Sequence, residues 1–68
     1  MKISARNILK GTIVEIVKGA TTSHVRIDTD GSVVTASITN EAVADLNLEK
    51  GKQAYAVVKA SDVMVGID

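Results

Sequence analysis

The chain has 68 residues, with eight basic and eight acidic side chains and a formal net charge of zero. That balance leaves no general field to attract nucleic acid or an anionic membrane, and the absence of cysteine excludes disulfides and thiolate metal sites. A chain this short buries only about 60 % of its unfolded surface, and small folds without disulfides or a metal commonly oligomerise. We therefore expect one domain, residues 1–68, that assembles with copies of itself.

The first half of the chain predicts two strands. Residues 8–18 carry apolar side chains on both faces near their C-terminal half, which is typical of a strand covered on both sides. Gly11 inside this strand predicts a bend or bulge. After a turn, residues 22–28 alternate cleanly, with an inward face made of Ser23, Val25 and Ile27.

The second half predicts three more strands and a helix. Asp30 and Gly31 mark a hairpin because glycine tolerates positive φ, and residues 33–39 form the next strand. Thr39 or Asn40 can cap a short helix over residues 41–46. A fourth strand over residues 53–59 and a fifth over residues 63–67 complete the chain. Five short strands with one helix between the third and fourth predict an all-β, OB-like barrel.

Several functional classes are poorly supported. The chain has no Cys nucleophile, no glycine-rich phosphate loop and no recognisable Ser-His-Asp set, so we expect no enzyme. Nucleic-acid binding by an OB-like barrel needs a basic groove with stacking aromatics, and Tyr55 is the only aromatic residue. No apolar run approaches a membrane span, and the N-terminus lacks the apolar core of a secretory signal. We expect a soluble, cytoplasmic protein without nucleic-acid or membrane partners.

Oxyanion binding fits the opening stretch better. Ser4 and Arg6 share one face of the strand entry, and a hydroxyl beside a planar five-donor cation suits a small anion. A solvated strand entry with an ordinary arginine is the alternative. Further donors are Thr39 at the helix start and the stretch Lys59-Ala60-Ser61. One small domain cannot easily surround an anion with these groups, whereas a subunit interface can.

The same segments carry a resemblance to a known family. Ser-Ala-Arg-Asn followed by Leu-Lys-Gly, then Ile-Thr, Gly-Lys and Val-Lys-Ala-Ser-Asp-Val-Met resemble the molybdate-binding Mop family, at the length of its free-standing members, the molbindins. The resemblance implies an OB-like fold whose subunits exchange strands in dimers and form a homohexamer, a trimer of dimers. It also implies molybdate or tungstate as the bound ligand, held for storage and homeostasis, with no organic cofactor and no metal cation site.

By matching position, the resemblance implies which residues line the dimer-interface site: Ser4, Arg6, Thr39, Lys59, Ala60 and Ser61. Arg6 and Lys59 would come from different subunits, and Ala60 would act through its backbone N–H. Family members often carry Ser at the position of Ala42, so one hydroxyl donor is missing here.

The family also implies a second kind of oxyanion site, which we place at a turn whose successive N–H groups can form an anion nest, made of Lys18, Gly19, Ala20 and Thr21. An ordinary hairpin turn is the alternative at this position. For the whole chain, the alternative function is a regulatory or accessory oxyanion-sensing module that acts with a molybdate transporter or a transcription regulator. A structural oligomer with a degenerate site is a third possibility.

Overall fold

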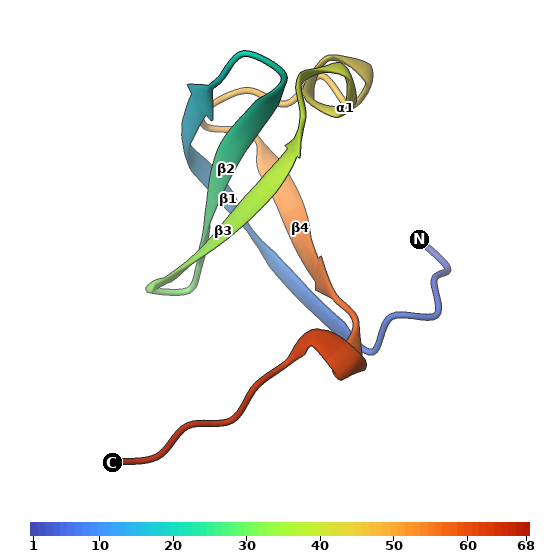
Figure 1. The fold of residues 1–68 in the computed structure, drawn as a ribbon, viewed down its shortest axis with the longest axis vertical. Coiled ribbons are helices and arrows are strands. Elements are labelled where there is room, and N and C mark those ends of the chain that lie inside the picture. The colour runs from blue at the N-terminus through green and yellow to red at the C-terminus, as the bar shows by residue number, and fades with distance from the viewer.

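The computed structural model describes all 68 residues as one antiparallel sheet with a short helix (Figure 1). The strands β1 (Asn7–Lys18), β2 (Thr22–Thr29), β3 (Ser32–Thr39) and β4 (Gln53–Val58) lie in the order β3-β2-β1-β4. The helix α1 (Asn40–Asp45) connects β3 to β4, and a 3₁₀ helix, η1 (Ala60–Asp62), follows β4. Neither helical segment has the length and hydropathy to cross a lipid bilayer. The predicted all-β fold, with one helix between the third and fourth strands, is confirmed.

The long strand β1 organises the sheet because its two halves pair with different neighbours. Its first half, from Asn7 to Thr12, pairs with β4, and its second half, from Thr12 to Lys18, pairs with β2. A β-bulge at Val14 shifts the β1–β2 register, and bulges increase local twist. The sheet therefore curls. The prediction was a bend or bulge at Gly11, and the bulge lies at Val14 instead. Gly11 pairs regularly with Ala54 and lies where β1 passes close to the backbone of Asp28.

Two local signals in the sequence set the β2–β3 hairpin and the start of α1. Asp30 and Gly31 have φ angles of 62° and 97°, and positive φ at both central residues defines a type I′ turn. Thr39, rather than Asn40, caps α1, because its Oγ1 accepts a hydrogen bond from the Ala42 N–H at 3.1 Å. Both predictions, the hairpin and the cap, are confirmed.

The core lies on the concave face of the curled sheet and consists of Ile13, Val25, Ile27 and Ala56. Val25 and Ile27 belong to the predicted inward face of β2, which is confirmed together with the buried Ser23. Val43 and Leu48, from α1 and the segment after it, pack against this cluster. Only 5 of 68 residues are buried, so the core of one chain is small and much apolar surface stays exposed.

The prediction of a fifth strand over residues 63–67 is wrong for the single chain. After η1 this segment runs away from the sheet and pairs with no strand (Figure 1). The side chains of Met64, Val65 and Ile67 are 94 %, 91 % and 94 % exposed. A strand needs a neighbour to complete its hydrogen-bond ladder, and neither edge strand, β3 or β4, receives the segment. The predicted five-stranded barrel is therefore an open, curled sheet of four strands.

Candidate functional site

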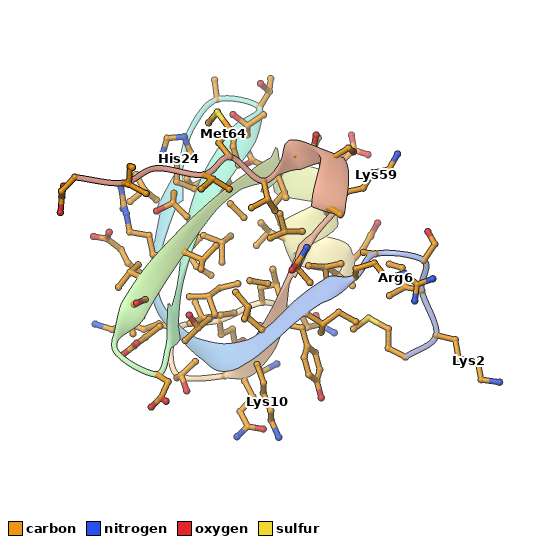
Figure 2. All side chains as sticks on the ribbon, turned by 90° about the horizontal axis from the view of Figure 1, so that it is seen from below. Lys2, Arg6, Lys10, His24, Lys59 and Met64 are labelled. Atoms are coloured by element: carbon orange, nitrogen blue, oxygen red, sulfur yellow. The ribbon has the colours of Figure 1, made fainter.

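Two segments that carry predicted site residues meet where β1 begins and β4 ends. Asn7 pairs with Val58 in the β1–β4 ladder, and its Nδ2 group donates a hydrogen bond to the Val58 carbonyl at 3.2 Å. Because the strands are antiparallel, the residues before Asn7 lie beside the residues after Val58. This part of the molecule, which we call the basic end, carries Ser4, Arg6, Lys59, Ala60 and Ser61, all exposed. Figure 2 labels Arg6 and Lys59.

The side-chain donors of the basic end have no acceptor within the chain. Neither Arg6 nor Lys59 forms an ion pair, since the one salt bridge of the protein joins Arg26 to Glu15. No side-chain hydrogen bond involves Arg6, Lys59 or the hydroxyl groups at this end. Both cations are therefore without a counter-ion in the single chain.

The turn η1 adds backbone donors to the basic end. Its own hydrogen bonds use the N–H groups of Asp62 and Val63, which donate to the carbonyls of Lys59 at 2.9 Å and Ala60 at 3.2 Å. The N–H groups of Ala60 and Ser61 have no acceptor, as expected at the start of a helical turn. Cations combined with free N–H and O–H groups suit an anion with several oxygens.

Thr39, predicted as part of the same site, lies at the opposite end of the sheet. It pairs with Thr22 in the β2–β3 ladder, near the end of β1 and the start of α1 (Figure 1). Since its Oγ1 accepts from the Ala42 N–H, its hydroxyl hydrogen remains available to donate. One chain thus brings together the predicted site residues except Thr39, which can reach an anion at the basic end only from another copy.

The turn predicted as a second oxyanion site, residues 18–21, is held in place by Asn40. The Gly19 N–H donates to the Thr22 carbonyl at 2.8 Å, and the Asn40 N–H donates to the Thr21 carbonyl at 2.9 Å. The Asn40 Nδ2 group donates to the Gly19 carbonyl at 3.1 Å. The Gly19 N–H is therefore engaged inside the turn and is not available to an anion, while Lys18 has no ion pair.

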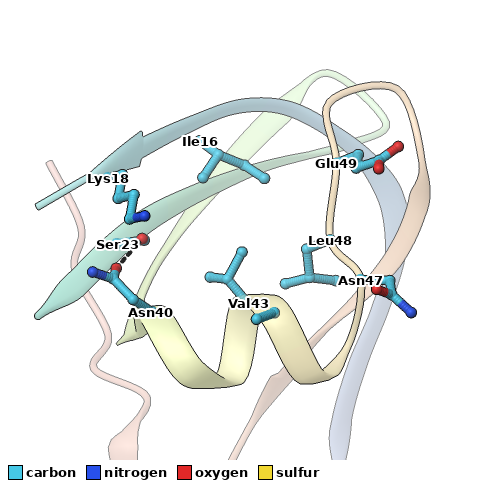
Figure 3. Close-up of a pocket in the computed structure, with 9 residues that line it drawn as sticks. Ile16, Lys18, Ser23, Asn40, Val43, Asn47, Leu48 and Glu49 are labelled. Atoms are coloured by element: carbon cyan, nitrogen blue, oxygen red, sulfur yellow. Dashed lines mark hydrogen bonds between the residues drawn. The ribbon is translucent and has the colours of Figure 1, made fainter.

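A cavity of about 250 Å³ lies beside this turn, between α1 and strands β1 and β2 (Figure 3). Lys18 and Asn40 line it together with apolar side chains such as Val43. Ser23, which is 2 % exposed, donates its hydroxyl hydrogen to Asn40 Oδ1 at 2.5 Å. The sequence analysis did not identify this pair. A serine on the inward face of an apolar strand is nevertheless a signal, because a buried hydroxyl group needs a hydrogen-bond partner.

Replacing Asn40 by alanine should destabilise the fold by about 1–3 kcal/mol, because the Ser23 hydroxyl would stay buried without a partner. Adding Ser23→Ala should recover part of this loss, since the unsatisfied group is then removed as well. Denaturant unfolding of the single and double variants measures both effects. An Asn40→Ala variant with the wild-type midpoint would show that this link does not stabilise the turn.

Comparison with known proteins places this geometry in a family. The family model described as the TOBE domain matches residues 3–65. The chain belongs to the TOBE-domain family. This TOBE domain is 51 % identical over 69 residues to a probable molybdenum-pterin-binding protein of Haemophilus influenzae, and the match covers 100 % of both chains. The predicted Mop resemblance is confirmed by this full-length relative.

Solved structures share the fold of this TOBE domain. A molybdate-binding protein from Sporomusa ovata superposes with a TM-score of 0.93 at 43 % identity, covering 98 % of this chain and 100 % of the other. The cytoplasmic molybdate-binding protein ModG, in a form with molybdate bound, gives a TM-score of 0.94 at 43 % identity, covering 100 % of this chain and 49 % of the other. These matches confirm the predicted OB-like fold.

Proposed function

We propose that this TOBE domain binds molybdate or tungstate reversibly, without catalysing a reaction. The proposal rests on the basic end, where Arg6 and Lys59 have no counter-ion and the N–H groups of Ala60 and Ser61 have no acceptor. In a chain of zero net charge, cations without a counter-ion at the same end of the sheet as free neutral donors match a tetrahedral dianion, whose oxygens accept several hydrogen bonds. The molybdate-binding structures that share this fold support the choice of anion.

The bound anion lies between copies of the chain. Every residue of the basic end is exposed in one copy, and charge pairs that stay in water contribute little free energy. A second copy excludes water and adds donors such as Thr39, with Arg6 and Lys59 of one site coming from different copies. Exposed apolar side chains on β1, including Ile8, Leu9 and Val17, are surface for such contacts to bury. The Mop resemblance implies that the full assembly is a hexamer, a trimer of strand-exchanged dimers.

Size, rather than charge, separates molybdate from sulfate at the proposed site. Both ions are tetrahedral dianions, so their net charge gives no discrimination. A pocket fitted to the larger ion leaves donors without partners around the smaller one, and each unsatisfied buried donor costs about 1–3 kcal/mol. The protein therefore holds molybdate or tungstate in the presence of sulfate, as storage and homeostasis require. The description of ModG as cytoplasmic supports the same location for this chain.

Calorimetric titration with molybdate, tungstate and sulfate, followed by native mass spectrometry of the same samples, tests this function. We expect molybdate and tungstate to bind at least about tenfold more tightly than sulfate, which corresponds to about 1.4 kcal/mol. The mass spectra should show the ions on oligomers and not on single chains. A protein that retains no oxyanion would contradict the proposal and favour a purely structural oligomer.

A further inference from the structure

The tip of the β2–β3 hairpin carries a chemically reactive pair of residues. Asp30 and Gly31 are both exposed there, at the end of the hairpin away from α1 (Figure 1). In an aspartate followed by glycine, no side chain on the glycine hinders its nitrogen from attacking the preceding carboxyl group. No atom lies within 4 Å of a Cβ built on Gly31, so neighbouring residues do not shield the tip.

The reaction open to this pair is closure of a succinimide ring. The Gly31 nitrogen gives up its proton and bonds to Cγ of the protonated Asp30 carboxyl group, whose hydroxyl leaves with a proton as water. Water then adds to one of the two ring carbonyls. Opening of the Cγ–N bond restores aspartate, whereas opening of the other C–N bond leaves isoaspartate, whose main chain runs through Cβ and Cγ. Water is lost and then regained, so the conversion needs no other reactant.

The Asp28 carboxylate holds the nitrogen that must attack. The Gly31 N–H donates a hydrogen bond to Asp28 Oδ1 at 2.9 Å and has no backbone acceptor. Asp28 is half-buried, and its backbone is fixed by pairing with Thr12 and Val33. Loss of the Gly31 proton would break the hydrogen bond and place a negative nitrogen beside a carboxylate, where like charges repel each other.

Independently of the oxyanion function, we propose that Asp30–Gly31 is a site of isoaspartate formation, and that the Asp28 carboxylate keeps the conversion slow in the folded protein. Hydrogen bonds to a charged group are among the stronger ones in proteins, and this one must be lost before the nitrogen reacts. Unfolding removes it, because Asp28 and Gly31 can then separate. The pair therefore converts mainly in chains whose hairpin is open.

The hairpin itself explains why a reactive pair stands at this position. Asp30 and Gly31 have φ angles of 62° and 97°, and a type I′ turn favours Asp-Gly because both central residues need positive φ. Isoaspartate would lengthen the main chain inside the turn, so Thr29 and Ser32, which pair at the end of the ladder, would lose their present alignment. Protection of the pair keeps both the turn and the register.

The experiment compares wild-type protein with Asp28→Ala and with the control Thr29→Val. The control removes the other side-chain hydrogen bond of the hairpin, from Thr29 Oγ1 to the Ser32 carbonyl at 3.0 Å, and leaves Asp28 in place. Each protein is incubated at neutral pH, folded and in urea, and then digested with trypsin. The peptide 27–50 has no internal Lys or Arg, and electron-transfer fragmentation distinguishes isoaspartate from aspartate at Asp30. Circular dichroism establishes which samples are folded.

Folded wild-type protein and folded Thr29→Val should form isoaspartate at Asp30 at least about fivefold more slowly than the same chains in urea. Folded Asp28→Ala should convert at least about fivefold faster than folded wild-type protein, as expected for the loss of one hydrogen bond to a charged group. In urea all three proteins should convert at similar rates. Asp45 precedes a leucine in the same peptide and should convert little in every sample.

Two results would overturn the protective role of Asp28. One is a folded Asp28→Ala variant that converts at the wild-type rate, and the other is an equal acceleration in Thr29→Val, which would assign the protection to the hairpin as a whole. Absence of isoaspartate at Asp30 in urea would reject the site itself.

Hydrogen exchange of wild-type protein decides the question if Asp28→Ala does not fold. Relative to the unfolded chain, the Gly31 N–H should be protected from exchange at least about fivefold more than the Asp30 N–H, which has no backbone acceptor. Equal protection of the two groups would contradict a hydrogen bond that restrains the Gly31 nitrogen.

Discussion

Replacing Arg6 by alanine should weaken molybdate binding at least about tenfold, or about 1.4 kcal/mol in binding free energy. A dianion bound at an interface from which water is excluded needs compensating positive charge. Removing one partner of a buried charge pair typically costs about 3–5 kcal/mol. Lys59→Ala should have an effect of the same order. Calorimetric titration of each variant against wild-type protein measures the change.

Lys10→Ala is the matched control for these variants. Lys10 is an exposed lysine of β1 that pairs with Tyr55 in the β1–β4 ladder and forms no ion pair. Its removal changes the net charge by the same amount, so a general electrostatic effect would appear in all three variants. We expect the control to keep wild-type affinity. Wild-type affinity in Arg6→Ala and Lys59→Ala, or an equal loss in all three, would contradict the assignment of the site.

Replacing Gly11 by alanine should destabilise the fold by about 2 kcal/mol or more, in the range of overpacking in a tight interior. A Cβ atom at this position would overlap the Asp28 carbonyl oxygen and lie 2.8 Å from Ile27 Cγ2. The Asp28 backbone cannot move aside easily, because this residue is paired with Thr12 on one side and Val33 on the other. The clash therefore acts on the β1–β2 ladder, around which the sheet is built.

Gly66→Ala provides the control for this substitution. No atom lies within 4 Å of a Cβ built at Gly66, so its effect should stay within about 0.5 kcal/mol, as for most surface substitutions. Denaturant unfolding at one fixed protein concentration measures both variants, since assembly makes stability depend on concentration. Equal midpoints for the two variants would show that β1 and β2 do not approach each other closely at Gly11.

The elements that the sequence predicted correctly depend on neighbours along the chain. The alternation of Ser23, Val25 and Ile27 defines the inward face of β2 without knowledge of any other strand. The pair Asp30–Gly31 fixes the hairpin through its own φ angles. Thr39 caps α1 because its Oγ1 accepts a hydrogen bond from the N–H of Ala42, only three residues further along the chain.

The features that the sequence did not predict depend on contacts between distant segments. The bulge at Val14 arises where β1 must match the register of β2, and no local residue type marks it. The link from Ser23 to Asn40 joins residues 17 positions apart. Residues 63–67 have the composition of a strand, but a strand also requires a neighbouring edge, and one chain does not provide it.

The candidate site was predicted mainly from the resemblance, because the spacing of Ser4 and Arg6 alone favours a solvated strand entry. The structure adds that the segments carrying Arg6 and Lys59 adjoin at one end of the sheet, because Asn7 is in register with Val58. It also separates Thr39 from them. A site that includes Thr39 therefore needs a second copy, and no short motif in the sequence encodes this separation.

The most direct test of the account is a crystal structure of the protein loaded with tungstate, located by the anomalous scattering of tungsten. We expect a tungsten peak at an interface between copies. The Arg6 guanidinium of one copy and the Lys59 ammonium of its neighbour should both lie within hydrogen-bonding distance of the oxyanion. A tungsten peak held by one chain alone, or one distant from both Arg6 and Lys59, would contradict the account.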